Sequence, residues 1–305
     1  MEKMLKNIFA YASNFGLFLT ITKKHIVLRR LLPKSLFFKL IFYRHKVIEK
    51  KIRSVVQDYE SRNLQINIEN NETKKIWFCW LQGKESMPDI VKSCYNSVVK
   101  NRGTYQVRFI SLYNYKEFVS LPQYILKMYE KGIIKNAHFA DIIRTYLLYK
   151  YGGLWIDATI YVNRQIPDYY NYDFYSLKLN SNPIYVSDCR WCNFFLFGKP
   201  GNKVMELTLK LFYSYLMEKN LFIDYFMMDY FIDIAYRDNL AVRESIDKIE
   251  PFGYDIYEMD KNLDNPLSLI PSFPFSIPFN KLHWKGDFQV EKNGEETLYH
   301  KIIEK

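Results

Sequence analysis

Two aspartates and an arginine within residues 136–159 are the side chains of this sequence best spaced to do chemistry together. Asp141 and Arg144 are three residues apart in a pattern that predicts a helix, so they share a helix face. Asp157 directly follows the apolar run 154–156, which predicts a strand. An aspartate at a strand end can hold a hard cation, and Arg144 can orient Asp141 or bind a phosphate. The same spacing also fits a helix-face ion pair and a polar strand end.

An α/β sheet is the scaffold that these side chains need, and the surrounding pattern predicts one. Apolar residues recur every three to four positions over 137–150, which predicts a helix that ends at Gly152 and Gly153. The chain before it is predicted to form strand 76–81, helix 88–100 and strand 105–112. This order is the unit of a doubly wound sheet, in which ligands bind beyond the carboxyl ends of the strands.

The remainder of the 305 residues contains no internal repeat and no linker rich in proline, glycine or serine, and its length allows a large core. Further elements are predicted as strands 160–162 and 194–197, helices 203–217 and 222–236, and a loop-rich tail over 251–278.

Positive charge is concentrated at the N-terminus. The chain carries a net charge of +10, but residues 1–53 hold 13 lysines and arginines against two glutamates, a net charge of +11 that leaves −1 for the rest. A nearly neutral body argues against a nucleic-acid partner, because nucleic-acid binding depends on a basic surface. The basic residues are interleaved with apolar and aromatic ones, which is typical of a segment that lies on an anionic membrane surface.

Residues 1–70 are therefore predicted as a helical, basic and apolar extension, and residues 71–305 as the main domain. The uncharged run 7–22 is shorter than the roughly 20 residues that span a bilayer. The alternative to membrane association is a helical hairpin that packs on the main domain and exposes a solvated basic face. The four cysteines make no disulfide framework or zinc site in a chain of this size, so we expect reduced cytosolic thiols.

The segment that carries Asp141 and Asp157 also resembles a known signature. Residues 140–159 resemble the D-x-D region of GT-A glycosyltransferases. The resemblance lies in Ala-Asp-Ile-Ile-Arg at 140–144, the apolar residues that follow, Tyr-Gly-Gly at 151–153 and Leu-Trp-Ile-Asp-Ala-Thr at 154–159. The similarity is to the capsular polysaccharide synthesis family, and through it to glycosyltransferase family 32 and the clostridial glucosylating toxins. It covers residues 74–165 closely and 185–285 loosely. The resemblance implies an α/β fold of GT-A type, a Rossmann-like mixed sheet flanked by helices.

The resemblance also implies roles for the central residues. Asp157 takes the place of the first D-x-D acid, which contacts a divalent metal, Mn²⁺ or Mg²⁺, and the donor ribose or diphosphate. Thr159 stands where the second acid belongs, and this departure from the pattern weakens the expected metal site. Asp141 and Arg144 are expected to hydrogen-bond the hydroxyl groups of the donor sugar. Trp80 matches the tryptophan that stacks on the donor base, and Trp77 is the competing choice, with a core position as its alternative.

Later residues extend this expected site. Asn193 is expected to face the sugar or the acceptor, or else to cap a local turn. Asp229 lies in an apolar helix, where a lone carboxylate is costly, so it should face the cleft or have a partner. The segment around His283, Trp284 and Lys285 falls where related enzymes contact metal or diphosphate. A neutral His283 can ligate the metal, and Lys285 can offset phosphate charge.

The expected function is transfer of a sugar from a nucleotide-diphosphate donor, with a UDP-sugar as the expected donor, to a glycan or glycolipid acceptor. Family 32 relatives retain anomeric configuration, so retention is expected here. The expected setting is the bacterial cytoplasm, at the inner face of the cytoplasmic membrane, in the synthesis of capsule or lipopolysaccharide. The alternative is a membrane-surface binding protein with a degenerate transferase domain. Neither the acceptor, the linkage nor the oligomeric state follows from the sequence.

Overall fold

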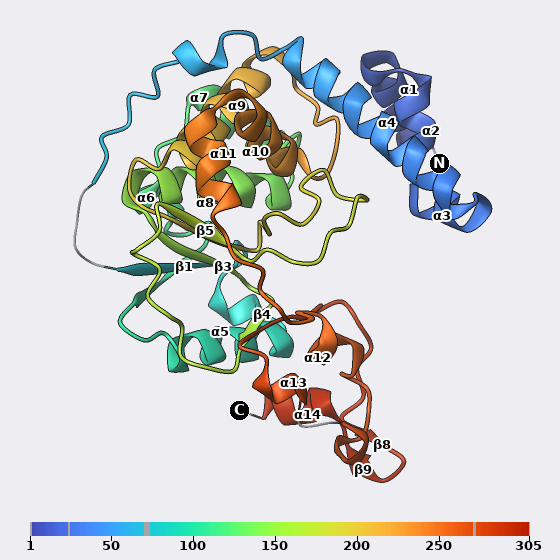
Figure 1. Cartoon of the computed structure of the whole chain (residues 1–305), viewed down its shortest axis with the longest axis vertical. Coiled ribbons are helices and arrows are strands. Elements are labelled where there is room, and N and C mark those ends of the chain that lie inside the picture. Colours follow the sequence, from blue (N-terminus) through green and yellow to red (C-terminus); the bar gives the residue numbers. More distant parts are fainter. Residues whose placement is uncertain (1, 24, 70–73, 271–272, 305) are drawn as a thin grey trace.

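A five-stranded mixed sheet forms the centre of the protein (Figure 1). The structure is a computed structural model and describes residues 2–23, 25–69, 74–270 and 273–304. The strand order is β2-β1-β3-β6-β5. β2, β1 and β3 are parallel, whereas β6 is antiparallel to both β3 and β5. The strands are β1 (Lys75–Cys79), β2 (Gln106–Ile110), β3 (Gly153–Asp157), β5 (Phe174–Ser176) and β6 (Phe195–Gly198).

Both faces of the sheet are covered, since the central strands β1, β3 and β6 are buried at every position except Asp157. In β3, Trp155 contributes to the hydrophobic cluster that contains α8, while Leu154 and Ile156 belong to the cluster on the opposite face. This alternation follows from the two-residue period of a strand. The α8 side also carries α9 and α10, and α5 lies on the other side (Figure 1). These helices are α5 (Asp89–Lys100), α8 (Asn136–Tyr151), α9 (Lys203–Glu218) and α10 (Met227–Asp238).

A short ladder outside the main sheet brings the C-terminal region back to the end of β3. β4 (Ile160–Val162) pairs antiparallel with β7 (Phe279–Lys281), and Ile160 lies opposite Lys281. The remaining elements are α6 (Tyr115–Phe118), α7 (Gln123–Glu130), α11 (Leu240–Asp247), α12 (Glu258–Lys261), α13 (Phe273–Ser276), α14 (Leu298–Ile303), β8 (Glu291–Lys292), β9 (Glu295–Glu296) and the 3-10 turns η1 (Tyr59–Ser61), η2 (Lys84–Ser86) and η3 (Leu267–Leu269).

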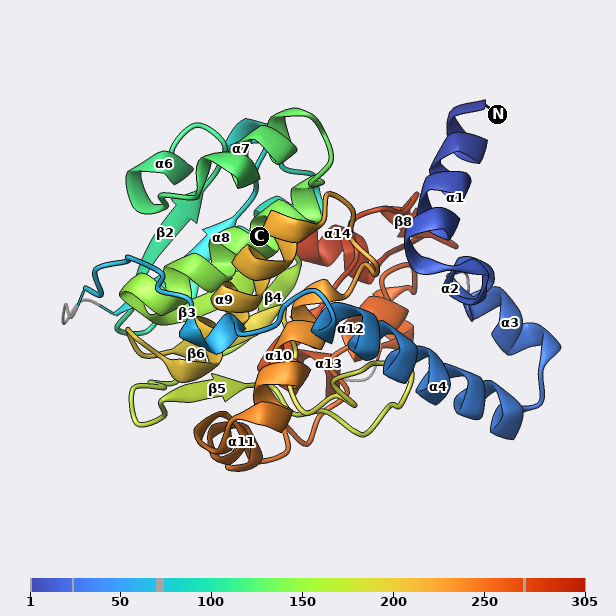
Figure 2. The ribbon, with the colours of Figure 1, turned by 90° about the horizontal axis from the view of Figure 1, so that it is seen from above.

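Four N-terminal helices lie beside the α/β body (Figure 2), namely α1 (Glu2–Phe15), α2 (Leu17–Thr22), α3 (His25–Leu31) and α4 (Lys34–Arg53). A buried ion pair joins Arg44 to Asp224 at 2.5 Å, and Arg53 pairs with Asp238 at 2.8 Å. The Tyr11 hydroxyl donates to the carbonyl of Ile223 at 2.6 Å. The segment predicted as an extension is thus helical, and it contacts both the residues that lead into α10 and the last residue of α10. The predicted boundary at residues 70 and 71 lies outside the described residues.

The predicted strands and helices of the main domain are confirmed, with one helix that begins later than predicted. α10 starts at Met227 rather than at 222, because the Asp224 carboxylate accepts the backbone N–H of Phe226 in a turn. The region 251–278, predicted as loop, contains the short helices α12 and α13, apart from residues 271–272, which lie outside the described part. All four cysteines are unpaired thiols. None of the helices in the described ranges is long and apolar enough to cross a bilayer.

Candidate functional site

The carboxylate of Asp157 is positioned by the alternation of β3. Trp155 faces α8, so Asp157, two residues later at the end of the strand, faces the same way. Gly152 and Gly153 make the tight entry into this strand with φ values of 64° and 101°. A Cβ atom at Gly153 would lie 2.5 Å from the carbonyl oxygen of Lys75, so only glycine allows β1 and β3 to approach in this register. The sequence pattern thus delivers Asp157 to the face that α8 covers.

Arg144 connects the helix to the strand. Its Nη2 atom lies 3.1 Å from Asp141 Oδ1, one turn earlier on α8, and 3.3 Å from Asp157 Oδ1. Its Nη1 atom donates to the backbone carbonyl of Asn193, and the guanidinium group lies 4.7 Å from the centre of the Trp155 ring. Only 7% of the Arg144 side chain is exposed. The three residues that the sequence grouped as a candidate site are therefore brought together around one buried guanidinium.

A lysine that sequence reasoning did not select completes this group. The Nζ atom of Lys281 donates to Asp157 Oδ2 at 3.1 Å and to the Thr159 hydroxyl at 2.8 Å. It comes from β7, more than 120 residues away in sequence, and the β4–β7 ladder fixes its position next to Thr159. Lys281 lies two residues before His283, next to the segment that the sequence predicts to contact metal or diphosphate. Only the pairing of two short strands distinguishes it from the other lysines, and no local motif predicts that pairing.

The two carboxylates occupy opposite electrostatic environments. Burial raises the pKa of Asp141 to about 6, although Arg144 counteracts the shift; the charge of Asp157 adds to it. Burial acts in the same direction on Asp157, but Lys281, then Arg144, and a hydrogen bond from the Trp155 indole at 2.8 Å hold its pKa below the ordinary value. Carboxylates that are driven apart in this way are typical of functional sites, because one remains charged while its neighbour can exchange a proton near neutral pH.

The tryptophans predicted for the donor base have different positions. Trp80 follows β1 and meets Trp284 edge to face, with ring centres 5.4 Å apart. Both are partly exposed, so their rings are available to a flat ligand. Trp77 is 0% exposed, donates its indole N–H to the Gly152 carbonyl at 2.8 Å and contacts core aromatics. A base cannot stack on a ring with no exposed face. The structure therefore assigns Trp77 to the core, which was its alternative.

Asn193 and Asp229 each have a hydrogen-bond partner in the structure. The Asn193 carbonyl accepts from Arg144, while its side-chain Oδ1 is buried without a hydrogen-bond partner among the described residues. Asp229, in the first turn of α10, accepts the indole N–H of Trp191 at 2.9 Å. Trp191 is thus the hydrogen-bond partner that a carboxylate in this apolar helix was expected to have. Burial raises the pKa of Asp229 to about 7, although the Trp191 hydrogen bond lowers it; Asp141 adds a further increase. The charge of Asp141 therefore acts on Asp229.

The C-terminal candidates lie on the exposed side. The Nδ1 atom of His283 is 2.7 Å from Asp260 Oδ1, and its backbone N–H donates to the same oxygen. Lys285 is exposed, with its Nζ atom 5.0 Å from the centre of the Trp284 ring. No hydrogen bond or ion pair within the described residues connects His283 to Asp157 or Thr159.

The arrangement of donors does not fit a resident divalent cation. Asp157 Oδ1 already accepts from Trp155, and Asp157 Oδ2 and the Thr159 hydroxyl are both bonded to the Lys281 ammonium group. Two unit charges about 4 Å apart interact by about 4 kcal/mol at an effective dielectric constant of about 20, and a divalent ion doubles that repulsion. One carboxylate and one hydroxyl next to a lysine are a poor ligand set for Mn²⁺ or Mg²⁺. The metal at Asp157, Thr159 and His283 stays a prediction that these contacts do not favour.

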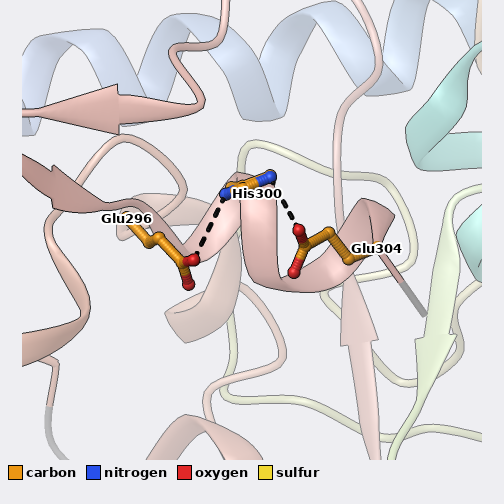
Figure 3. A group of neighbouring side chains, drawn as sticks. All are labelled: Glu296, His300 and Glu304. Atoms are coloured by element: carbon orange, nitrogen blue, oxygen red, sulfur yellow. Dashed lines mark ion pairs between the residues drawn. The ribbon is translucent and has the colours of Figure 1, made fainter.

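A second group of potential metal ligands lies near the C-terminus (Figure 3). Glu296 Oε1 is 3.9 Å from His300 Nδ1, and Glu304 Oε1 is 3.0 Å from His300 Nε2. The two carboxylates therefore face different nitrogens of one imidazole ring. His300 on α14 and Glu304 at its C-cap are four residues apart, the spacing of an ordinary pair on a helix surface, and Glu296 precedes the helix in β9.

Comparison with known proteins gives the family. Residues 29–302 match the family described as capsular polysaccharide synthesis protein, which suggests a role in making capsular polysaccharide. The match begins within α3, so it includes α4 as well as the α/β body, whereas the motif resemblance started at residue 74. No curated protein matches the chain significantly. The mixed sheet with helices on both faces is consistent with a GT-A-like fold. With most of its length matched, the chain belongs to the capsular polysaccharide synthesis protein family.

Proposed function

We propose that this protein is a glycosyltransferase that moves a sugar from a nucleotide-diphosphate donor to a glycan or glycolipid acceptor. The observation that carries the proposal is the group of Asp141, Arg144 and Asp157 at the carboxyl end of β3. Strand ends of this kind are where α/β folds bind nucleotides. The exposed rings of Trp80 and Trp284 add a surface on which a base can stack. The family's role in capsule synthesis supplies a context in which this chemistry is needed.

The proposed reaction exchanges one bond at the anomeric carbon for another. The bond from that carbon to the diphosphate oxygen breaks, and the oxygen keeps the electron pair. The acceptor hydroxyl oxygen bonds to the same carbon, and its proton passes to the departing phosphate. Such a reaction depends on positioning and on stabilising the charge of the leaving group. Asp141 and Arg144 would hold sugar hydroxyls, and the cations near Asp157 would attract the diphosphate. Retention is the expected stereochemistry, and a UDP-sugar is the expected donor.

A panel of nucleotide sugars tests this proposal. Many transferases slowly hydrolyse their donor when no acceptor is present, so release of nucleoside diphosphate reports donor use without knowledge of the acceptor. We expect one donor class to be hydrolysed by the purified chain and to raise its thermal stability, because a ligand that binds only the native state stabilises it. A Trp77→Phe variant is unsuitable as a control, since that ring is in the core. The exposed Leu240→Ser variant is a suitable one.

The alternative is a binding protein that uses the same site without transfer. It predicts that a nucleotide sugar stabilises the chain but is never hydrolysed, even with capsular or lipid-linked glycans added. The enzyme is favoured by the buried Arg144 between two carboxylates whose pKa values are shifted in opposite directions, because such pairs are typical of acid–base sites.

We also propose that the helices α1–α4 hold the protein against an anionic membrane surface, where a glycolipid acceptor is located. In α4 the buried positions Phe37, Ile41 and Ile48 face inward, whereas Phe42 and Tyr43 are exposed. Among the side chains whose burial is described, the most exposed apolar residues of these helices are Phe9, Leu17, Leu31 and Phe42. The exposed lysines and arginines in the same described set are Lys23, Arg29, Arg30, Lys34, Lys39, Lys46 and Lys50. Apolar and cationic side chains in alternation suit the interface of an anionic bilayer.

A further inference from the structure

Lys281 is the residue of the site whose position no sequence motif explains. β7 pairs with β4 so that Lys281 lies opposite Ile160, and the backbone N–H of Leu282 donates to the Thr159 carbonyl at 2.8 Å. These backbone hydrogen bonds between the two chain segments hold Lys281 beside Thr159. Its Nζ atom then reaches Asp157 Oδ2 and the Thr159 hydroxyl together. The ammonium group is thus fixed at the two positions that correspond to the D-x-D acids.

The hydrogen-bond capacity of Lys281 leaves room for a ligand. An ammonium group has three N–H donors and no acceptor. Asp157 and Thr159 use two of them, and the side chain is 21% exposed, so the third donor can reach a ligand from solvent. The Phe194 ring, 5.0 Å from Nζ, covers part of the remaining surface. A compact cation with a free donor is well suited to an oxygen of a phosphate.

The acceptors of the site are also distributed in a way that suits a lysine rather than a metal. A threonine hydroxyl is a weaker ligand for a hard divalent ion than a carboxylate, but it accepts a hydrogen bond from an ammonium group equally well. A threonine at position 159 instead of a second acid is therefore the acceptor that suits the Lys281 ammonium group. Two carboxylates would bind a divalent ion. In the group of Asp157, Thr159 and Lys281, the lysine already supplies the positive charge.

We propose that the Lys281 ammonium group binds the donor diphosphate in place of a divalent metal, so that nucleoside diphosphates bind this protein without a divalent cation. This inference rests on the proposed function, because it assumes a nucleotide donor at this site. Asp157 then serves to position Lys281 rather than to ligate an ion. Thr159 holds the second N–H bond and directs the third toward the phosphate.

Binding measured with and without metal tests the inference. The purified full chain is treated with EDTA, and UDP, GDP, ADP and CDP are titrated by calorimetry in EDTA, in Mg²⁺ and in Mn²⁺. For the preferred nucleotide we expect dissociation constants that agree within about threefold across the three conditions, a difference of less than about 0.7 kcal/mol. Binding that appears only with Mg²⁺ or Mn²⁺ overturns the inference but leaves the proposed function standing. Absence of binding to every nucleotide in all three conditions removes both.

Two variants and a control sharpen the result. Lys281→Gln keeps the length of the side chain and removes its charge, so we expect at least a tenfold loss of affinity in EDTA. The double change Thr159→Asp with Lys281→Gln restores a pair of acids and removes the resident cation, so its nucleotide binding should become dependent on Mn²⁺. Lys301→Gln, an exposed lysine on α14, is the matched control and should bind as the unchanged protein does.

The outcome does not depend on the variants alone. Circular dichroism and the thermal midpoint show whether each variant folds, and if Lys281→Gln does not, the metal comparison on the unchanged protein still decides. A Lys281→Gln protein that folds and binds nucleotide with unchanged affinity in EDTA contradicts the inference.

Discussion

Nη2 of Arg144 lies 3.3 Å from Oδ1 of Asp157, although the two residues belong to different elements, α8 and β3. The contact joins the helix that carries the sugar-binding candidates to the strand end that carries the phosphate-binding candidates. Because the same Nη2 atom also contacts Asp141, one buried guanidinium sets the separation of both carboxylates. The site therefore depends on Arg144 for its geometry as well as for its charge.

Replacement of Arg144 should damage both fold and function. Arg144→Ala leaves Asp157 and Asp141 close together without the cation between them, and removal of one partner of a buried ion pair costs about 3–5 kcal/mol. We expect a loss of that size in the free energy of unfolding, measured by urea denaturation, together with loss of donor hydrolysis. Arg144→Lys keeps the charge but not the planar fork, so it should recover part of the stability and little of the activity. A fully stable Arg144→Ala protein contradicts this account of the site.

Neutralising the two aspartates should change the free energy of unfolding in opposite directions. The pKa of Asp141 is raised to about 6, so its folded state binds a proton more tightly than the unfolded chain, and its contribution to stability falls as pH rises from about 4 to 6. Asp141→Asn removes that cost and should stabilise the protein at neutral pH by up to about 3 kcal/mol, while donor hydrolysis is lost.

Asp157 has the reverse linkage. Its pKa is lowered, so its ionised form stabilises the fold, and that stability is present above the pKa of the unfolded chain and is lost as pH falls through the folded value. Asp157→Asn should therefore destabilise the protein at neutral pH by about 1.5–3 kcal/mol, the range for hydrogen bonds to charged groups. Thermal unfolding of both variants from pH 4 to pH 8 checks the pair, and equal signs for the two changes would refute the electrostatic assignment.

Much of this site follows from the sequence, and the exceptions have identifiable causes. Asp141, Arg144 and Asp157 could be predicted because helix and strand periods are local, and each period fixes the face on which a side chain lies. Trp77 could be assigned only as one of two alternatives, since a buried strand is apolar on both faces and its pattern does not show which ring reaches the surface. Lys281 was missed because its position depends on the pairing of β4 with β7, which lie far apart in sequence.

The N-terminal helices show a similar limit. Their helical, basic and apolar character is visible in the sequence, and so is the choice between membrane association and packing on the domain. The structure shows that the inner residues, such as Arg44 with Asp224, pack on the domain. The outer ones, such as Leu31, are exposed, so packing leaves a surface free for a membrane. An ion pair between residues 180 positions apart has no signal in a local pattern.

Nucleotide binding should change the fluorescence of the two partly exposed tryptophans. Trp77, Trp155 and Trp191 are fully buried, whereas Trp80 and Trp284 meet at the surface. Stacking of a base on an aromatic side chain contributes about 1–3 kcal/mol. We expect quenching by the preferred nucleoside diphosphate, and its loss in a Trp80→Leu, Trp284→Leu variant whose affinity falls at least about tenfold. Quenching that survives both substitutions places the base elsewhere.

Membrane association should depend on the exposed apolar residues of α2, α3 and α4. Leu17, Leu31 and Phe42 are 70%, 73% and 61% exposed, so their replacement by serine removes apolar surface at no cost to the core. The triple variant should sediment about tenfold less with vesicles of phosphatidylglycerol, and added salt should weaken binding of the unchanged protein. Leu240→Ser with Leu269→Ser is the matched control, since these leucines are 65% and 70% exposed on the main domain. Equal sedimentation of both variants would rule out the proposed surface.

Transfer by the Asp141→Ala and Asp157→Ala variants is the most direct test of the central claim. The rate at which nucleoside diphosphate is released from the preferred nucleotide sugar is measured for the unchanged protein and for both variants, with circular dichroism to verify that each is folded. The account predicts measurable release by the unchanged protein and its loss in both folded variants. Release at an unaltered rate in both, or no release from any nucleotide sugar even with glycan acceptors present, would contradict it.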